Sequence, residues 1–371
     1  MSEPFSSLSL VEDVSTVGSG GRGGGGNALL RAVIGIALGL AIGVAAGMAL
    51  TASEVPAADE RPTAAVALGD SVLAGEGAGS YEPGTDGENG NWCHRSTEAL
   101  VHKLAVADRA VNLACSGATS ADVALGDAVH HAEGSQVRRL ADLAKRYRVT
   151  TVVVQTGAND DPRFGDTMVD CVIAWLNPFG RGCRTSLREE WPERLTAMRP
   201  KVAAVLTDVR TVLRDAGYRD EDYELVVLSY ASPVTEKMDR AGHGVDGCPL
   251  KLDDAAYGRL EAVPQLADAL REVAGGADAR FLDLSRATEG REACSGGDDR
   301  SGEWQRGLTV DPRALRVGTP ADVLPHLVQQ SFHPTAAGHA RFASCLREFL
   351  TTDAATARCV PTPDGDLRLD R

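Results

Sequence analysis

Short apolar runs rich in β-branched residues alternate along the chain with longer segments whose apolar positions recur at helical spacing. Such runs predict buried strands, and the longer segments predict amphipathic helices. The predicted strands cover residues 63–68, 111–114, 150–154, 225–229 and 281–284. The predicted helices cover residues 96–107, 135–147, 187–216, 253–274 and 334–350. The segment 187–216 is either one helix or two helices broken near Pro200, and 253–274 is expected to be interrupted at Pro264. Strands that alternate with helices indicate an α/β fold, in which helices cover both faces of a mostly parallel sheet.

The chain before the first predicted strand has a different pattern. Residues 1–27 are polar and glycine-rich, and this composition predicts a disordered tail. The segment 32–52 contains no charged residue. As a helix it would span about 31 Å, which matches the hydrocarbon core of a bilayer. We therefore predict a transmembrane helix within residues 28–52, followed by a linker over residues 53–62.

Charges on the two sides of this segment predict its orientation. Arg22 and Arg31 precede it. The acidic residues Glu54, Asp59 and Glu60 follow it. The positive-inside rule then places the tail in the cytoplasm and the rest of the chain outside the cell membrane. A cleaved signal peptide is the alternative, because the small residues at 49–52 suit a cleavage site, and the protein would then be secreted.

Glycine recurs at every fourth position of the apolar segment, at Gly35, Gly39, Gly43 and Gly47. Small residues at this spacing share one face of a helix and allow two transmembrane helices to approach closely. Self-association in the membrane is therefore one interpretation of the pattern. The other is that glycine and alanine are common in export segments.

Cysteine usage agrees with export. Eight cysteines follow the apolar segment and none precedes it, which predicts disulfides in an oxidising compartment. Sequential pairing is the simplest arrangement, because each bond then closes a local loop: Cys93 with Cys115, Cys171 with Cys183, Cys248 with Cys294, and Cys345 with Cys359. The cysteines are dispersed and form no Cys-x-x-Cys pair, so we predict no zinc site.

Composition and charge exclude one class of partner. The hydrophobic fraction of 43% and the charged fraction of 24% are those of a globular protein. The formal net charge of −14 argues against nucleic acid, because phosphates are bound by Lys and Arg side chains that displace counterions. No pattern in the sequence indicates a metal ion or an organic cofactor.

Polar loops that contain glycine follow three of the predicted strands. They cover residues 69–71 (Gly-Asp-Ser), 116–117 (Ser-Gly) and 157–160 (Gly-Ala-Asn-Asp). Because parallel strands end at one edge of a sheet, where ligands bind, we expect these loops to lie close together. A serine at such a strand end is placed as a nucleophile. His333 immediately precedes the last predicted helix, from which it would reach back toward this serine.

The order serine, glycine, asparagine and histidine resembles the SGNH hydrolases, which form the GDSL esterase and lipase family. Residues 75–77 (Gly-Glu-Gly) and 91–96 (Asn-Trp-Cys-His-Arg-Ser) also resemble the secreted actinobacterial members of this family. The matching blocks are residues 69–72, Gly117, residues 157–160 and residues 333–334, within a resemblance that extends from residue 65 to about residue 350. The resemblance implies a flavodoxin-like three-layer α/β/α fold with a central, mostly parallel five-stranded sheet. We accordingly expect the hydrolase domain over 63–360 and a flexible tail over 361–371.

The resemblance also implies a role for each matching residue. Ser71 would attack an ester carbonyl, with His333 as the general base that accepts its proton. The backbone N–H groups of Ser71 and Gly117, together with the side-chain amide of Asn159, would form the oxyanion hole. No cofactor is implied.

One position departs from the family pattern. The family usually has an acidic residue three positions before the histidine, and this chain has Gln330 there. An uncharged amide does not stabilise an imidazolium as a carboxylate does. Because some family members orient the histidine through a backbone carbonyl at this position, we expect a Ser71–His333 dyad in which the Gln330 carbonyl orients the imidazole.

The sequence is less informative about the substrate. The apolar stretch between residues 160 and 183 follows the Asn159 loop, so it would wall an acyl pocket, cover it as a lid, or simply pack in the core. The favoured interpretation is an esterase or lipase that acts on small-molecule or lipid esters outside the cytoplasm. The alternatives are an O-acyl esterase or acyltransferase that acts on cell-envelope carbohydrate and, third, a non-catalytic binding module.

Overall fold

The computed structural model describes residues 60–160, 164–238, 243–296, 299–316 and 320–371. The predicted tail over 1–27, the predicted transmembrane helix within 28–52 and most of the linker over 53–62 lie outside the described residues. Within the described part of the chain, no helix combines the length and the apolar character needed to cross a membrane. Residues Arg61–Arg371 form one compact unit.

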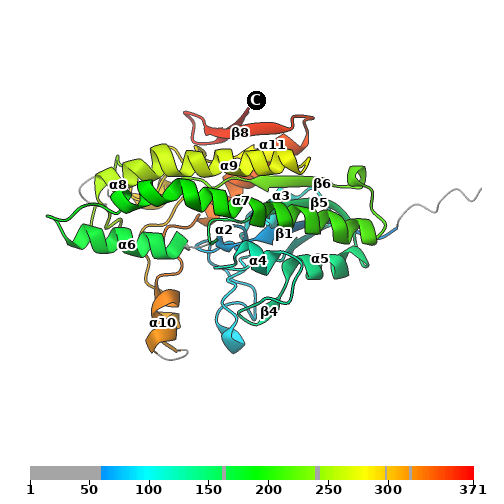
Figure 1. Cartoon of the computed structure of the whole chain (residues 1–371), viewed down its shortest axis with the longest axis horizontal. Coiled ribbons are helices and arrows are strands. Elements are labelled where there is room, and N and C mark those ends of the chain that lie inside the picture. The colour runs from blue at the N-terminus through cyan, green and yellow to red at the C-terminus, as the bar shows by residue number, and fades with distance from the viewer. Residues whose placement is uncertain (1–59, 161–163, 239–242, 297–298, 317–319) are drawn as a thin grey trace, which may run out of the picture. The chain divides into compact units, whose positions relative to one another are not determined.

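A seven-stranded sheet forms the centre of this part of the chain (Figure 1). Its strand order is β2-β1-β5-β6-β7-β8-β9, and every neighbouring pair is parallel except β8 and β9. The strands are β1 (Thr63–Gly69), β2 (Arg109–Asn112), β5 (Arg148–Gln155), β6 (Glu224–Leu228), β7 (Arg280–Asp283), β8 (Thr356–Pro361) and β9 (Leu367–Asp370), and a separate short hairpin joins β3 (Val129–His130) to β4 (Glu133–Gly134). The five predicted strands match β1, β2, β5, β6 and β7.

The expected count of five strands is too low, and the expected flexible tail over 361–371 is wrong. Strand β9 turns back on β8 and pairs with it in the antiparallel direction, from Arg358 opposite Asp370 to Pro361 opposite Leu367. In β9 the side chains alternate between buried leucine and exposed polar residues. This two-residue period is the signature of a strand with one buried face, but over four residues it is too short to identify a strand from sequence.

The helices are α2 (Ser71–Ala74), α3 (Leu100–Leu104), α4 (Ser120–Val123), α5 (Gln136–Ala144), α6 (Phe164–Leu176), α7 (Arg184–Asp215), α8 (Leu252–Tyr257), α9 (Val263–Gly276), α10 (Pro320–Leu327) and α11 (Ala336–Leu350). The five predicted helices match α3, α5, α7, the pair α8 and α9, and α11 with shifted ends, whereas α2, α4, α6 and α10 were not predicted. A π-helical turn, η3 (Gly258–Ala262), joins α8 to α9, and short 3₁₀ turns are η1 (Glu88–Gly90), η2 (Asp220–Asp222), η4 (Arg300–Gly302) and η5 (Pro312–Arg316).

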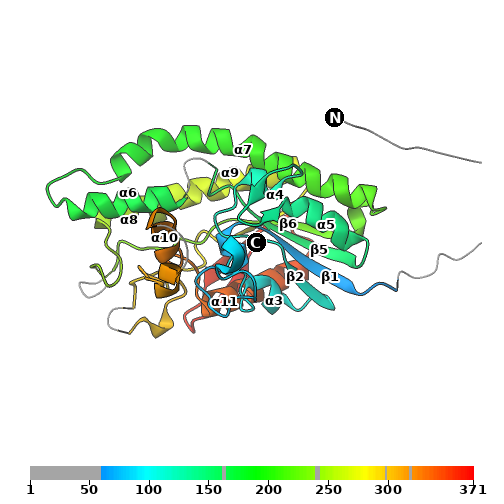
Figure 2. The same cartoon turned by 90° about the horizontal axis from the view of Figure 1, so that it is seen from below.

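Two apolar cores on opposite faces of the sheet give the three-layer fold that the resemblance implies. One core joins α5, α7 and α9 to the face of β1 that carries Val66 and Leu68. The other joins α3 and α11 to the opposite face, which carries Ala65 and Ala67. Figure 2 shows α7 and α9 on one side of the sheet and α3 and α11 on the other. The α/β/α expectation is therefore confirmed.

Helix α7 runs without interruption through Pro192 and Pro200, although a proline removes one backbone donor from a helix. The side chains of Val202, Val205 and Leu206 on its inner face are fully buried against the sheet. This burial outweighs the local cost of the prolines, since tertiary packing supplies most of the stability of helices in proteins. The amino-terminal part of α7 extends beyond the sheet with α6 and α8 (Figure 2).

Candidate active site

Ser71 is the first residue of α2, and only Asp70 separates it from the end of β1. Asp70 caps this helix, because its Oδ1 accepts a hydrogen bond of 3.1 Å from the Val72 N–H. The strand and the turn are closely packed at Gly69, where a Cβ would lie 2.0 Å from the carbonyl oxygen of Gln155. The glycine is therefore required for the backbone to bring the serine to the end of a central strand.

His333 lies against this serine. Its Nε2 is 2.8 Å from the Ser71 Oγ, although the two residues are 262 positions apart in the chain. The other ring nitrogen, Nδ1, is 2.8 Å from the backbone carbonyl oxygen of Ser331. Since a carbonyl only accepts, this bond assigns the proton to Nδ1 and leaves the Nε2 lone pair for the serine hydroxyl.

The structure corrects the expected role of Gln330. The carbonyl that holds the histidine belongs to Ser331, one residue later than expected. Phe332 adopts a left-handed conformation with φ of 59°, and this tight turn folds the ring of His333 back onto the carbonyl two residues before it. The Gln330 side chain points elsewhere and donates a 2.8 Å hydrogen bond to Asp311. A backbone carbonyl does accept a hydrogen bond from His333, but it belongs to Ser331 and not to Gln330.

Gly117 and Asn159 lie on neighbouring loops. Gly117 has φ of +78°, a conformation that side-chain-bearing residues avoid. The Asn159 amide donates one hydrogen bond of 3.1 Å to the carbonyl of Ala118, which leaves its second N–H. The two loops are also joined where Asp160 accepts hydrogen bonds of 2.9 and 2.5 Å from the N–H and the hydroxyl of Ser120. Ser71, Asn159 and His333 line one cavity, whereas Gly117 is not among the described lining residues.

The carboxyl group of Asp70 is buried beneath the serine. Burial raises the pKa of Asp70 to about 7, although a hydrogen bond from the Tyr230 hydroxyl and the bond from Val72 oppose the shift. Tyr230 also lines the cavity and has its own pKa raised by burial. This pair stabilises the turn that carries Ser71, and neither group contacts His333 through a described hydrogen bond.

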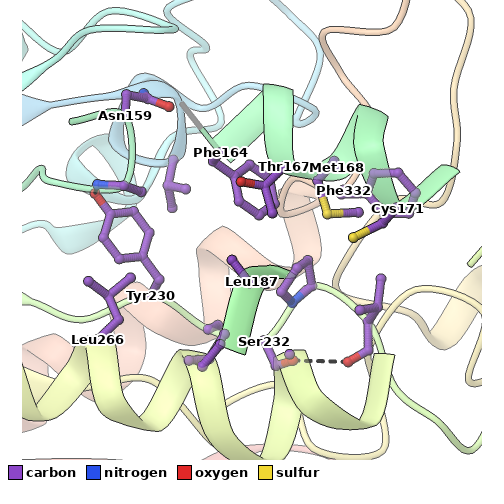
Figure 3. A pocket seen from close by; sticks show the side chains of 18 of the residues that line it. Asn159, Phe164, Thr167, Met168, Cys171, Leu187, Tyr230, Ser232, Leu266 and Phe332 are labelled. Carbon is purple, nitrogen blue, oxygen red and sulfur yellow. Dashed lines mark hydrogen bonds between the residues drawn. The ribbon is translucent and has the colours of Figure 1, made fainter. Parts of the chain in front are cut away.

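The cavity next to the serine is mostly apolar (Figure 3). Helix α6 contributes Phe164 and Met168, and the opposite wall comes from α7 and α9, with residues such as Leu187 and Leu266. The sequence left open whether the apolar stretch between 160 and 183 walls a pocket or packs in a core. The structure gives the stretch two faces, because Phe164 and Met168 line the cavity while Ile173, Leu176 and Phe179 are exposed to solvent.

The sequence model of the GDSL-like lipase/acylhydrolase family matches residues 67–341 of this chain. The chain belongs to this family. Its membership confirms the resemblance found in the sequence and makes it a carboxylic ester hydrolase. The matched region begins within β1 and ends within α11, so it includes all four sequence blocks.

Solved structures of two Streptomyces enzymes are similar to this GDSL family member. Phospholipase A1 from Streptomyces albidoflavus NA297 is 23% identical, with a TM-score of 0.52 over 79% of this chain and 100% of that chain. An extracellular lipase from Streptomyces rimosus is 24% identical, with a TM-score of 0.46 over 78% of this chain and 100% of that chain. The first of these likenesses shows a common fold. A search of curated proteins finds no match.

The hydrolase contains four disulfides with the predicted sequential pairing: Cys93–Cys115, Cys171–Cys183, Cys248–Cys294 and Cys345–Cys359. One of them bears on metal binding. His130 and His131 lie close to Cys115 in a grouping that would suit a cation, but the sulfur of Cys115 is bonded to Cys93. A sulfur in a disulfide is not a thiolate, so these three residues do not form a ligand set.

One residue beside the dyad was not identified as functional from the sequence. Glu76 is fully buried two residues after the end of α2, and its carboxylate contacts two of the loops described above. The signal was present in the sequence as an acidic residue between two glycines, Gly75 and Gly77. Such a pattern is equally typical of an exposed turn, and only the fold shows that the carboxylate points inward.

Proposed function

We propose that this protein is an extracytoplasmic serine esterase or lipase in which Ser71 and His333 form a catalytic dyad. The distance of 2.8 Å between the Ser71 Oγ and the His333 Nε2 carries the proposal. This geometry is that of a nucleophile within hydrogen-bond reach of its general base. The Ser331 carbonyl takes the place of a triad acid in fixing the tautomer.

The reaction proceeds through an acyl-enzyme. As the Ser71 Oγ bonds to the ester carbonyl carbon, its proton passes to Nε2 of His333. Collapse of the tetrahedral intermediate breaks the bond to the alcohol oxygen, which takes that proton as it leaves. Water then attacks the acyl-enzyme, His333 accepts its proton and returns it to the Ser71 Oγ, and the carboxylic acid departs.

The oxyanion is stabilised by Ser71, Gly117 and Asn159. The Ser71 N–H lies in the first turn of α2, where a helix leaves its N–H groups without intrahelical partners. Gly117 contributes its backbone N–H, and Asn159 contributes the amide hydrogen not bonded to Ala118. Each such donor lowers the barrier by roughly 3 kcal/mol in comparable sites.

The acyl group of the substrate is an apolar chain. The cavity beside Ser71 has walls of Phe164, Met168, Leu187 and Leu266, which favour hydrocarbon over a hydroxyl-rich sugar. The substrate is thus a small-molecule or lipid ester.

Three features support a location outside the cytoplasm. All eight cysteines of the chain are paired in disulfides, which persist in oxidising compartments. The uncharged segment 32–52 has the length of a membrane anchor, and the charges around it support a position of the hydrolase domain outside the membrane. The glycine spacing of this segment would also permit self-association of the anchor.

The test is hydrolysis of p-nitrophenyl esters from acetate to palmitate by the full chain in detergent. We expect activity that increases with acyl length, and a loss of roughly a thousandfold or more in Ser71→Ala. Ser301→Ala, at an exposed 3₁₀ turn, is the matched control and should retain full activity. Equal activity in Ser71→Ala would refute the nucleophile. If the enzyme hydrolysed only acetylated glycans and none of the p-nitrophenyl esters, the substrate would be a cell-envelope carbohydrate ester and not a lipid ester.

A further inference from the structure

Glu76 has a carboxylate that is fully buried and accepts hydrogen bonds from four side chains. The Ser116 hydroxyl donates at 2.5 Å, the Gln329 amide at 2.7 Å and the Tyr81 hydroxyl at 3.1 Å. Nδ1 of His94 lies 2.9 Å from both carboxylate oxygens. A buried carboxylate is costly unless it is surrounded by donors, and this one is.

The donors come from the segments that carry the proposed catalytic groups. Ser116 directly precedes Gly117, and Gln329 lies four residues before His333. Glu76 itself follows the helix that begins at Ser71, and its N–H donates a 3.0 Å hydrogen bond to the Ser71 carbonyl. One residue therefore joins α2, the loop that contains Ser116 and Gly117, and the loop that leads from Gln329 to His333.

The segment of Glu76 also packs directly on the histidine. A Cβ at Gly77 would lie 3.0 Å from the Cβ of His333, so the backbone after Glu76 and the histidine are in close contact. The Gly77 carbonyl in turn accepts a hydrogen bond from Nε of Arg306. The Arg306 N–H donates to the His333 carbonyl at 2.9 Å, which closes a second connection between the two segments.

Electrostatics favour the ionised form of this carboxyl group. Burial on its own raises the pKa of Glu76, but the charge and hydrogen bond of His94, the charge of His333 and the Ser116 hydroxyl outweigh it and hold the pKa at about 2. The effect is reciprocal at His333, where burial lowers the pKa and Glu76 opposes that shift. Glu76 is thus an anion at every pH at which the enzyme would work.

We propose that Glu76 is a positioning residue for His333 that supplies the negative charge a triad acid would carry, while the Ser331 carbonyl fixes the tautomer. Glu76 acts through its charge and through the two loops it holds rather than by direct contact. The inference rests on the proposed Ser71–His333 dyad. When the imidazolium forms during acylation, the buried negative charge stabilises it, because charges interact strongly where water is excluded. The hydrogen bonds to Ser116 and Gln329 keep Gly117 and His333 in register with Ser71.

Other charged groups surround this arrangement, and they define what a pH experiment reports. His94 lies between Glu76 and Asp86, whose Oδ1 is 3.3 Å from the His94 Nε2. Asp86 is paired with Arg313 at 2.6 Å. On the far side, the buried His339 also interacts electrostatically with His333. Asp70, with its pKa of about 7, lies in the cavity lining.

The first experiment replaces Glu76 by glutamine in the full chain and measures the pH profile of ester hydrolysis. We expect Glu76→Gln to lower kcat by about tenfold or more with little change in KM. Since loss of an anion lowers the pKa of His333, the acidic limb of kcat/KM should move to lower pH by about one unit. A purely structural role would lower activity without moving this limb. Glu221→Gln, at an exposed 3₁₀ turn, should change neither quantity.

A second pair of variants separates charge from tethering and serves if Glu76→Gln does not fold. Ser116→Ala and Gln329→Ala each remove one tie while leaving the carboxylate in place. We expect both to lower kcat while the acidic limb stays where it is in the wild type. The inference would be overturned if Ser116→Ala and Gln329→Ala both kept the wild-type kcat. It would also be overturned if Glu76→Gln folded and the acidic limb of its kcat/KM profile did not move. Either result leaves the dyad itself standing, since that is tested separately by Ser71→Ala.

Discussion

At the scale of single residues, the imidazole of His333 is held by a backbone carbonyl on one side and faces the serine hydroxyl on the other. A general base must be neutral before it accepts a proton. Burial lowers the pKa of His333 below its usual value of 6.5. We therefore expect the acidic limb of the kcat/KM profile to have its midpoint below pH 6.5. A midpoint above pH 6.5 would mean that the charge of Glu76 raises the pKa of His333 by more than burial lowers it.

Replacement of Gln330 by alanine should change the rate less than about threefold, because the Gln330 side chain bonds to Asp311 and not to His333. Its loss should cost about 1 kcal/mol of unfolding free energy, the usual contribution of one hydrogen bond. Steady-state kinetics and denaturant unfolding of Gln330→Ala measure the two effects. A loss of several hundredfold in rate would show that this side chain takes part in orienting the histidine.

Asp70 should give the stability of the fold a pH dependence of its own. Its folded pKa of about 7 lies above the unfolded value of 3.8, so its contribution is present below about pH 4 and is lost as the pH rises through 7. Glu76 has the opposite sign, and its contribution is lost only as the pH falls toward 2. Urea unfolding between pH 5 and 8 tests Asp70 by comparing the wild type with Asp70→Asn, because the buried histidines titrate in the same range in both proteins. The decrease of stability with pH that Asp70 contributes should be missing from the slope of Asp70→Asn. An unchanged slope would exclude this role.

The sequence indicated that Ser71 and His333 lie close together, because one follows a strand end and the other precedes a helix at the same sheet edge. The resemblance to the SGNH hydrolases then assigned them the roles of nucleophile and base. The contribution of Gln330 was misassigned by one residue, because the φ of Phe332 decides which carbonyl meets the ring, and no sequence pattern specifies that angle. The inward direction of Glu76 depends on contacts with Ser116 and Gln329, which are remote in the chain.

At the scale of secondary structure elements, α6 and α7 are joined by the Cys171–Cys183 disulfide, and both cysteines line the cavity. Removing this bond in Cys171→Ser/Cys183→Ser should cost about 3 kcal/mol, since the bond closes a short loop. The wall of the cavity should also loosen, so hydrolysis of long-chain esters should fall more than hydrolysis of acetate. Thermal unfolding and the p-nitrophenyl ester series measure the two effects.

The Cys345–Cys359 disulfide provides the matched control for this experiment. It joins α11 to β8 with a sequence separation of 14, against 12 for Cys171–Cys183. Cys345→Ser/Cys359→Ser should therefore lose similar stability while its chain-length preference stays that of the wild type. A shift in preference in both double variants would mean that stability, and not the wall of the cavity, sets the preference.

The elements were predicted to different degrees for a physical reason. Central strands such as β5 are buried on both faces and show continuous apolar runs, which the sequence displays openly. The edge strand β9 is short and half exposed, so its pattern is weak. Helix α6 has apolar side chains on both its cavity face and its solvent face, so the contrast that identifies an amphipathic helix is reduced.

At the scale of the whole molecule, the prediction concerns where the hydrolase resides. If residues 28–52 form an uncleaved anchor, the full chain should sediment with membranes, and protease added to intact cells should remove the hydrolase domain. Deletion of residues 1–52, with a separate signal peptide attached, should release active enzyme into the medium. Recovery of the intact full chain in the soluble fraction would exclude an anchor, and a new amino terminus near residue 52 would identify the segment as a signal peptide.

The Cys93–Cys115 disulfide has a consequence for the order of events in biogenesis. Its two sulfurs belong to residues directly adjacent to His94 and Ser116, both of which contact Glu76. The covalent link therefore brings together two of the four side chains that surround this carboxylate. A chain kept in a reducing compartment lacks that link, so formation of this disulfide is a maturation step for the enzyme. Recombinant production accordingly calls for a host compartment that forms disulfides.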